Sequence, residues 1–344
     1  MKRLSTFALL ATACAAASAQ SNITLFGIID ANVRIVNNGN GSLTSLSGAG
    51  LNTSRLGVRG SEDLGGGLRA GFWLETGLNP DTGTTSDSTR FWNRRSTVSL
   101  TSETLGEVRM GRDFTPTYNG YTNYDAFGSN GVAAVDKFFP STLGTGNPSI
   151  DTGTRADNLV SWFTPKNLGG FYGQLSAAAG EGVSGKRYYG GRVGYSAGPL
   201  DVSAAYGQTK VVPTVAGGEE KVVVYDLGAS YDFNAFQLMG LFGETKYGNL
   251  KQDVLEIGTV VPVGVGAIRA SYVHANAKGG TIDANDADQI AIGYVHHLSK
   301  RTALYTSFAR VNNKGGATFA VATPPALVTG KDSKGAEFGI RHSF

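Results

Sequence analysis

Arginine recurs on one face of short segments in which apolar residues alternate with polar or small ones. In Arg55–Gly60, for example, Leu56 and Val58 alternate with Arg55 and Arg59. A guanidinium group stays charged at physiological pH and holds its donors in a rigid fork, which suits the attraction of anions. The chemistry that these residues offer is therefore electrostatic, the guidance of a negatively charged solute.

Residues for bond-breaking chemistry are scarce. A barrel enzyme would need a nucleophile or an activated water next to a base. The histidines are His274, His296, His297 and His342, and none falls near the arginines or in the long segment described below. The acidic run Asp283–Asp288 lacks the Gly and the bidentate Glu of a calcium-binding EF-hand loop, so we interpret it as a solvated loop. We expect no catalytic residue, no cofactor and no metal.

The elements that would position the arginines are strands. Gly is abundant, at 49 of 344 residues, and Pro is scarce, at 10. Alternating segments of about ten residues, separated by turns, are typical of outer-membrane barrels. A period of two places the apolar set on one face and the polar set on the other. In lipid such a sheet must close, because every backbone polar group needs a partner.

The connections between these segments alternate between short and long, as in bacterial outer-membrane barrels, whose periplasmic turns are short and external loops long. The short ones are Glu62–Gly66, Ser102–Gly106, Thr164–Gly169, Ala197–Pro199, Asp232–Asn234, Val261–Val263 and His297–Lys300. The long ones are Val36–Gly50, Gly77–Thr89, Phe114–Thr154, Glu181–Lys186, Lys210–Glu220, Tyr247–Lys251, Ala277–Asn285 and Asn312–Ser333. Fifteen connections predict an all-β, 16-stranded antiparallel transmembrane barrel. A barrel of this size leaves an aqueous channel.

The longest connection, Phe114–Thr154, is too long and too aromatic for a solvated tether. Its rings are Phe114, Tyr118, Tyr121, Tyr124, Phe127, Phe138 and Phe139. They must pack against something, and we expect this loop to fold into the mouth of the barrel. The alternative is a lid lying on an ordinary β domain.

The first 19 residues have the build of a secretory signal peptide: Lys2 and Arg3, a short apolar run, and Ala17-Ser18-Ala19 before the cleavage site. Residues 20–344 are then expected to form one barrel domain. Without Lys2 and Arg3 the basic and acidic residues are almost equal in number, so overall charge gives no reason to expect nucleic acid as a partner.

Several runs resemble the trimeric general porins of Gram-negative bacteria, in particular those of beta-proteobacteria. They are NITLFGIIDANV, SRLGVRGSEDLGGGLRAGFWLETG, GEVRMGRD, LSKRTALYTSFA and the ending GIRHSF. The resemblance implies an outer-membrane homotrimer in contact with lipid and lipopolysaccharide, with a third external loop that narrows each pore. It also implies that Phe344 is part of the signal read by the barrel-assembly machinery. Several members of this group prefer anions through lumen arginines.

The predicted strand parity gives the lumen residues of this chain. We expect Arg55, Arg95 and Arg155 at the constriction, with Glu75 pairing part of the cluster. Asp125 and Asp136 on the long loop would supply the opposing wall. Further lumen-lining bases are Arg34, Arg59, Arg69 and Arg109. The alternative for any one arginine is that it balances an acid or fixes the loop.

The predicted function is passive diffusion of small hydrophilic solutes, with anions favoured. A solute-specific channel for phosphate or a dicarboxylate uses the same residues, and the sequence separates it poorly from the first function. Gly and Ala on the outward parity of Asn22–Arg34 and Phe171–Ala177 would allow close packing between subunits, so we expect a homotrimer.

Overall fold

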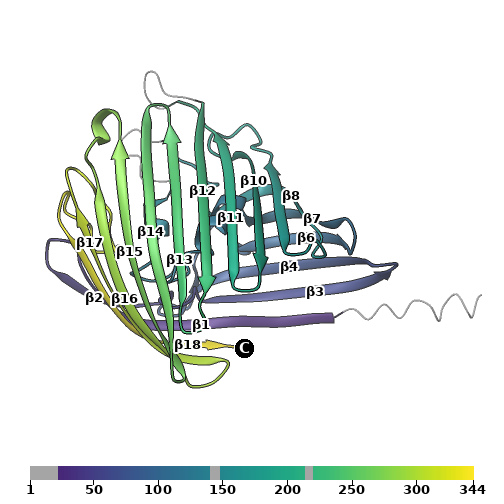
Figure 1. Ribbon diagram of the computed structural model, residues 1–344, viewed down its shortest axis with the longest axis horizontal. Coiled ribbons are helices and arrows are strands. Elements are labelled where there is room, and N and C mark those ends of the chain that lie inside the picture. The colour runs from purple at the N-terminus through teal and green to yellow at the C-terminus, as the bar shows by residue number, and fades with distance from the viewer. Residues whose placement is uncertain (1–21, 140–147, 214–219) are drawn as a thin grey trace, which may run out of the picture.

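The computed structural model describes residues 22–139, 148–213 and 220–344, and these form a closed antiparallel barrel (Figure 1). Each long strand pairs with its neighbours in chain order, and β1 pairs with β18 to close the ring. The sixteen wall strands are β1 (Asn22–Asn37), β3 (Arg55–Gly65), β4 (Leu68–Asn79), β6 (Arg95–Ser102), β7 (Gly106–Phe114), β8 (Arg155–Phe163), β9 (Phe171–Ala178), β10 (Arg187–Ala197), β11 (Leu200–Lys210), β12 (Lys221–Asp232), β13 (Gln237–Tyr247), β14 (Leu250–Val263), β15 (Gly266–Lys278), β16 (Ala287–His297), β17 (Thr302–Asn313) and β18 (Ser333–Ser343).

The remaining elements lie in external connections. Two short strands, β2 (Ser42–Ser47) and β5 (Thr84–Thr85), extend the connections after β1 and β4. The long loop carries helix α2 (Pro116–Thr122) and the 3₁₀ turn η1 (Asp136–Phe138), and η2 (Gly280–Ile282) follows β15. No helix in these described ranges is long and apolar enough to cross a membrane.

The two faces of the wall have opposite character. Large apolar side chains are exposed on the outside, among them Ile23 at 66% and Val193 at 64%. Polar side chains such as Asp30, Gln174 and Glu337 are buried on the inside. This inversion of the usual pattern is expected where the outer face meets lipid and the lumen is polar.

The seam between β1 and β18 contains the chain's last residue. Phe344 N donates to Gly27 O at 3.0 Å, and Gly27 N donates to Phe344 O at 3.1 Å. A Cβ on Gly27 would overlap the Phe344 ring. Phe344, the predicted assembly signal, therefore packs outside the barrel at the point where it closes.

Three predicted connections are wrong in detail. In Glu62–Gly66, Glu62 and Asp63 belong to β3 and pair with Ala70 and Arg69 of β4. Val261–Val263 belongs to β14, and the turn is formed by Gly264 and Val265. Pro262 is tolerated in the strand because pairing with β13 ends at Val260. Tyr247–Lys251 is not a long loop: β13 and β14 are joined by two residues, of which Gly248 takes a φ of 59°. The predicted signal peptide, residues 1–19, lies outside the described residues.

Candidate functional site: the arginine wall of the lumen

The long loop enters the barrel as a compact unit. Thr115 N donates to Thr154 O at 3.2 Å and closes the neck of the loop. Thr115 also caps α2, its side-chain oxygen accepting from Tyr118 N at 3.4 Å, and Pro116 begins the helix. These two contacts orient α2 so that it packs against the inner wall formed by β9 to β13.

The loop is held by an apolar cluster inside the barrel. Five of its rings are buried against inward residues of β12 to β17: Tyr121, Tyr124, Phe127, Phe138 and Phe139. A Cβ on Gly228 would overlap the ring of Tyr124, and one on Gly243 would overlap Phe139. The wall therefore has two recesses in which these rings lie, and the loop is fixed to one side of the lumen.

An upper tier of arginines lies across the lumen from this cluster, and we use this name for Arg55, Arg94 and Arg155. Arg55 Nη1 lies 3.4 Å and Arg94 Nε 2.6 Å from Glu75 Oε1. The guanidinium of Arg155 stacks on Phe114, 4.2 Å from the ring centre, and its Nε has no hydrogen-bond partner among the described residues. Two guanidinium groups thus share one carboxylate, and the third, that of Arg155, makes no ion pair among the described residues.

A lower tier continues toward the periplasmic end, and it consists of Arg59, Arg69, Arg95 and Arg109 around Trp73. The indole of Trp73 lies between two guanidinium groups, with the Cζ of Arg59 at 5.0 Å and that of Arg95 at 4.4 Å. Together the lower-tier residues line a cavity of about 310 Å³.

Two acids on β7 restrain part of this tier. Arg109 pairs with Glu107 at 2.9 Å and with Asp113 at 2.7 Å, and Arg95 pairs with Asp113 at 3.6 Å. The strand register shifts between Gly111 and Asp113, and Gly111 has a φ of 130°. Such a bulge re-aims the side chains that follow it, which here places Asp113 beside both arginines.

Arg34 lies apart from both tiers. Its Nε donates to Glu337 Oε1 at 2.6 Å, and Glu337 Oε2 accepts from Val132 N of the loop at 3.2 Å. Arg34 therefore neutralises an acid that fixes the loop, which is the alternative that the sequence left open for any single arginine.

The two predicted loop acids have different surroundings. Asp125 is only 4% exposed and accepts backbone N–H groups from Phe127, Ser129 and Val135 at 2.7–3.0 Å. Asp125 therefore stabilises the conformation of the loop, and its carboxylate is not exposed to the pore. Asp136 is half-buried in η1, and this burial raises the pKa of its carboxyl to about 6.

The phenol of Tyr118 is influenced by both Asp136 and the upper tier. Burial raises the pKa of its phenol, the negative charge of Asp136 raises it further, and the charges of Arg155, Arg94 and Arg55 oppose this. Tyr118 also stacks on Phe114, with the ring centres 4.7 Å apart. Asp136 and the upper tier therefore act on the same phenol with opposite sign.

The predicted site did not include Arg94 or Trp73. Arg94 directly precedes β6, where the alternation that points Arg95 inward gives no direction for its neighbour. It is only 9% exposed, and its N–H donates to Glu75 O at 3.1 Å. Trp73 shares the inward parity of Glu75, and its Nε1 donates to Glu75 Oε2 at 3.1 Å.

Comparisons with known proteins agree with this architecture. A family model described as Gram-negative porin matches residues 5–316. The chain belongs to the Gram-negative porins. The outer membrane porin protein 32 of Delftia acidovorans is 42% identical over 100% of this chain and 99% of its own length. An anion-selective porin from Comamonas acidovorans superposes with a TM-score of 0.84 at 40% identity, over 94% of this chain and 100% of that one.

A more distant structure agrees in fold alone. The trimer form of OmpT from Vibrio cholerae has a TM-score of 0.67 at 14% identity, over 94% of this chain and 99% of that one. Family membership places this porin in the outer membrane of a Gram-negative cell and identifies it as a channel, not an enzyme.

Proposed function

We propose that this porin is a passive diffusion channel for small hydrophilic solutes and that it favours anions. The observation that carries the proposal is the upper tier, in which Arg55 and Arg94 pair with the single acid Glu75, and Arg155 stacks on Phe114 without an ion pair among the described residues. A cleft lined by one sign of charge, with a low-dielectric wall behind it, focuses the field on a passing ion. The anion selectivity named for the Comamonas relative supports the same function here.

The lower tier extends the positive lining below the constriction. Arg69 and Arg109 also line a second cavity of about 740 Å³, together with Lys166 and Arg192. An anion that leaves the upper tier therefore continues along a positive surface toward the periplasm. We propose that Phe114–Thr154 sets the width of the path and that these arginines set its charge preference.

Planar-bilayer recording of the purified protein tests the proposal. In a KCl gradient the zero-current potential should have the sign of chloride preference. Because screening reaches about 8 Å at physiological ionic strength and about 3 Å at 1 M, the preference should weaken in concentrated salt. A cation-preferring or unselective channel in dilute salt would contradict the proposal.

One observation favours a solute-specific channel as a second candidate. The Nε of Arg155 is buried without a partner among the described residues, beside two further guanidinium groups. Phosphate or a dicarboxylate could accept from it, since bidentate pairing with such groups is the strong interaction of arginine. Concentration-dependent block of chloride current by one of these anions would support specific binding, and no block at millimolar concentration would exclude it.

We further propose that the porin is a homotrimer assembled through the face around β1. Its outward side chains include Ile23, Leu25 and Ile29, and the small residue Ala31 follows on the same face. β9, which contains Phe171–Ala177, lies six strands away around the barrel and falls outside this interface.

A further inference from the structure

Arg192 on β10 is a lumen cation whose hydrogen-bond partners are neutral. It lines the cavity of about 740 Å³ below the constriction. Its Nε donates to Ser203 Oγ at 3.1 Å, and its Nη2 donates to the hydroxyl of Tyr172 at 2.9 Å. The Cζ also lies 4.9 Å from the centre of the Tyr172 ring. Within the described ranges the guanidinium therefore makes hydrogen bonds but no ion pair.

The long loop also contacts this guanidinium. Asn123 caps the C-terminus of α2. With its amide oxygen turned toward Arg192, it accepts from Nη1 at 3.2 Å and from Nη2 at 2.8 Å. The next residue, Tyr124, is only 1% exposed and occupies the recess at Gly228. The end of α2 is thus fixed next to Arg192.

An acid lies close to Arg192 but is held by tyrosines. Oδ1 of Asp201 on β11 accepts from the hydroxyl of Tyr124 at 2.6 Å and from that of Tyr172 at 3.0 Å. The Tyr172 hydroxyl thus links Arg192 to Asp201 through two hydrogen bonds. Arg192 and Tyr172 line the cavity, whereas Asp201 is not among its lining residues in the part of the chain that the structure describes.

The shape of the wall fixes the position of the Tyr172 ring. Tyr172 on β9 is the cross-strand partner of Gly194 on β10. A Cβ on Gly194 would overlap the ring and the hydroxyl of Tyr172. A glycine within a strand often marks such a close approach. The hydroxyl is therefore held over β10, where it can contact both charged side chains.

Other acids of the lumen wall pair directly with arginines. An arginine nitrogen lies 2.5–2.9 Å from a carboxylate oxygen of Glu75, Glu107, Asp113 and Glu337. A carboxylate that reached Arg192 in this way would occupy its fork of donors. Asp226 on β12 is also affected by the charge of Arg192, but its carboxylate oxygens have no hydrogen-bond partner among the described residues. Arg192 thus differs from the paired arginines.

The cavity that Arg192 lines contains more cations than acids. Its cations are Arg69, Arg109, Lys166 and Arg192, and its acids are Glu103 and Glu107. Glu107 pairs with Arg109 at 2.9 Å, and Glu103 lies in the exposed turn between β6 and β7. A cleft with an excess of one sign of charge raises the local concentration of the opposite ion. An anion in this cavity can therefore use Arg192 as a donor.

We propose that Tyr124 and Tyr172 keep Asp201 from pairing with Arg192, and that Arg192 is thereby a selectivity residue of the cavity below the constriction. This inference rests on the proposed anion preference of the channel. The two tyrosines are positioning residues, because they act through Arg192 and not on the anion itself. The long loop, which supplies Asn123 and Tyr124, then affects the charge preference below the constriction as well as the width of the path.

Planar-bilayer recording in a dilute KCl gradient tests the role of the two hydroxyls. Tyr124→Phe with Tyr172→Phe removes both and changes no charge, so Asp201 becomes free to pair with Arg192. We expect this double variant to lose the part of the anion preference that Arg192→Gln also loses. Asp201→Asn should shift the zero-current potential little in the unmodified protein and should restore it in the double variant, because the effects of coupled residues are not additive.

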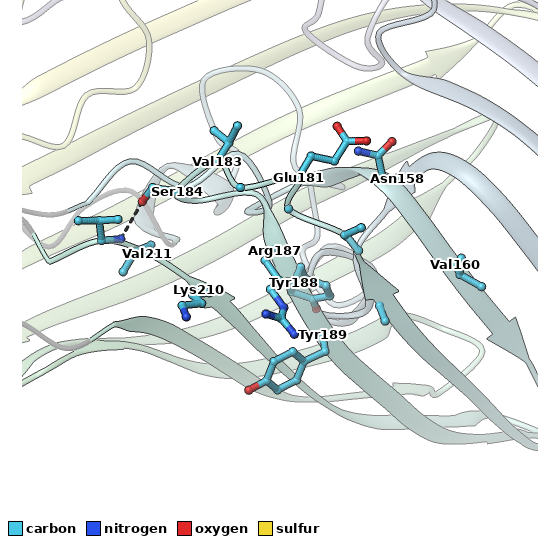
Figure 2. A pocket seen from close by; sticks show the side chains of 16 residues that line it. Asn158, Val160, Glu181, Val183, Ser184, Arg187, Tyr188, Tyr189, Lys210 and Val211 are labelled. Atoms are coloured by element: carbon cyan, nitrogen blue, oxygen red, sulfur yellow. Dashed lines mark hydrogen bonds between the residues drawn. The ribbon is translucent and has the colours of Figure 1, made fainter.

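The matched control also replaces two tyrosines by phenylalanine, on the strand that carries Arg192. Tyr188 and Tyr189 directly follow Arg187 at the start of β10 (Figure 2). The Tyr188 hydroxyl has no hydrogen-bond partner among the described residues, and Tyr189 is 46% exposed. Tyr188→Phe with Tyr189→Phe should therefore keep the zero-current potential of the unmodified protein.

Two electrical results would overturn the inference. One is an unchanged potential in the Tyr124→Phe, Tyr172→Phe variant, and the other is an equal shift by Asp201→Asn in both backgrounds. A crystal structure of the double variant is an independent test, because Arg192 and Asp201 should lie at ion-pair distance there, and continued separation would also overturn the inference. An unselective unmodified channel would contradict the proposed function alone, since the crystal structure tests the pairing without any measurement of selectivity.

Discussion

At the scale of single residues, Glu75 and Trp73 join the two tiers of arginines. Glu75 accepts from Arg55 and Arg94 above and from the indole of Trp73 at 3.1 Å. The faces of that indole in turn contact the guanidinium groups of Arg59 and Arg95. The arginines are therefore held in fixed directions without being neutralised one by one.

Replacing Trp73 tests this arrangement without changing any charge. Trp73→Leu removes the ring between Arg59 and Arg95, and each cation–π contact contributes roughly 0.5–2 kcal/mol. We expect a partial loss of anion preference, read from the zero-current potential. Trp73→Phe keeps a ring but loses the hydrogen bond to Glu75. Its zero-current potential should therefore lie between those of Trp73→Leu and the unmodified protein. Identical potentials in all three would show that the indole does not position the arginines.

Arg155→Glu changes the charge of the upper tier by two units. We expect the zero-current potential in a dilute KCl gradient to move toward cation preference, and the shift should shrink in 1 M salt. The control is Lys300→Glu, an equal charge change in the exposed turn between β16 and β17. If the two substitutions shift the potential equally, selectivity comes from the overall charge of the barrel and not from the tier.

Selectivity should also depend on pH through Asp136. Burial raises the pKa of its carboxyl to about 6, so it becomes protonated as the pH falls from 7 to 5. A negative charge that acts on Tyr118 of the loop is then lost, and anion preference should increase with a midpoint near pH 6. Throughout this pH range, the Asp136→Asn variant should have the anion preference that the unmodified protein reaches at acidic pH. If the anion preference of this variant still changes with pH as in the unmodified protein, another group is responsible.

The raised pKa of Asp136 also makes the stability of the docked loop depend on pH. A carboxyl whose pKa is raised in the folded state favours docking when it is protonated. That contribution is complete below its usual pKa of 3.8 and is lost as the pH rises through about 6. Lys137, whose pKa burial lowers to about 8, contributes in the opposite sense, because its charged form is disfavoured. Both contributions are lost between about pH 6 and pH 8, so the docked loop should resist proteolysis least in this interval and better at lower or higher pH.

The sequence could predict which arginines face the lumen, but it could not predict their partners. Alternation gave the inward direction of Arg55, Arg95 and Arg155 correctly, because side-chain direction in a strand has a period of two. Arg94 lies outside a strand, where this period does not apply. Arg34 has the correct parity, but its pairing with Glu337 depends on where the loop lies, which no local pattern encodes.

At the scale of elements, the long loop is held by shape as well as by hydrogen bonds. Gly228 and Gly243 leave recesses in β12 and β13 for Tyr124 and Phe139. The sequence predicted that the aromatic loop enters the barrel, since its rings needed a surface. It could not identify the recesses, because a glycine in a strand has several possible causes.

Deletion of Gly128–Gly146 tests the loop as an element. The wall strands are joined by their own backbone hydrogen bonds, so the barrel should still fold. Conductance should rise, because Val132, Val135 and Phe138, which now fill one side of the lumen, are removed. Deletion of residues 214–219, between β11 and β12, is the control and should leave conductance nearly unchanged. An unchanged conductance in the first deletion would show that the loop does not limit the pore.

At the scale of the whole molecule, the outer surface has two distinct sides. In a ring of sixteen strands β11 lies eight steps from β1, diametrically opposite. The β1 side exposes apolar and small side chains, and the β11 side exposes Lys210 beside Arg187 of β10. A threefold assembly through β1 would direct β11 outward to the lipid.

A pair of substitutions separates subunit contact from lipid contact. Leu25 on β1 and Val193 on β10 face outward and are 62% and 64% exposed in the single barrel. A lysine on a lipid-facing strand costs up to about 2–4 kcal/mol, depending on depth, and both changes carry this cost. Leu25→Lys should in addition bury charges between subunits, so unboiled samples should migrate as monomers and conduct in single steps. Val193→Lys should remain trimeric and conduct in steps of three, and if both variants behave alike, β1 is not the interface.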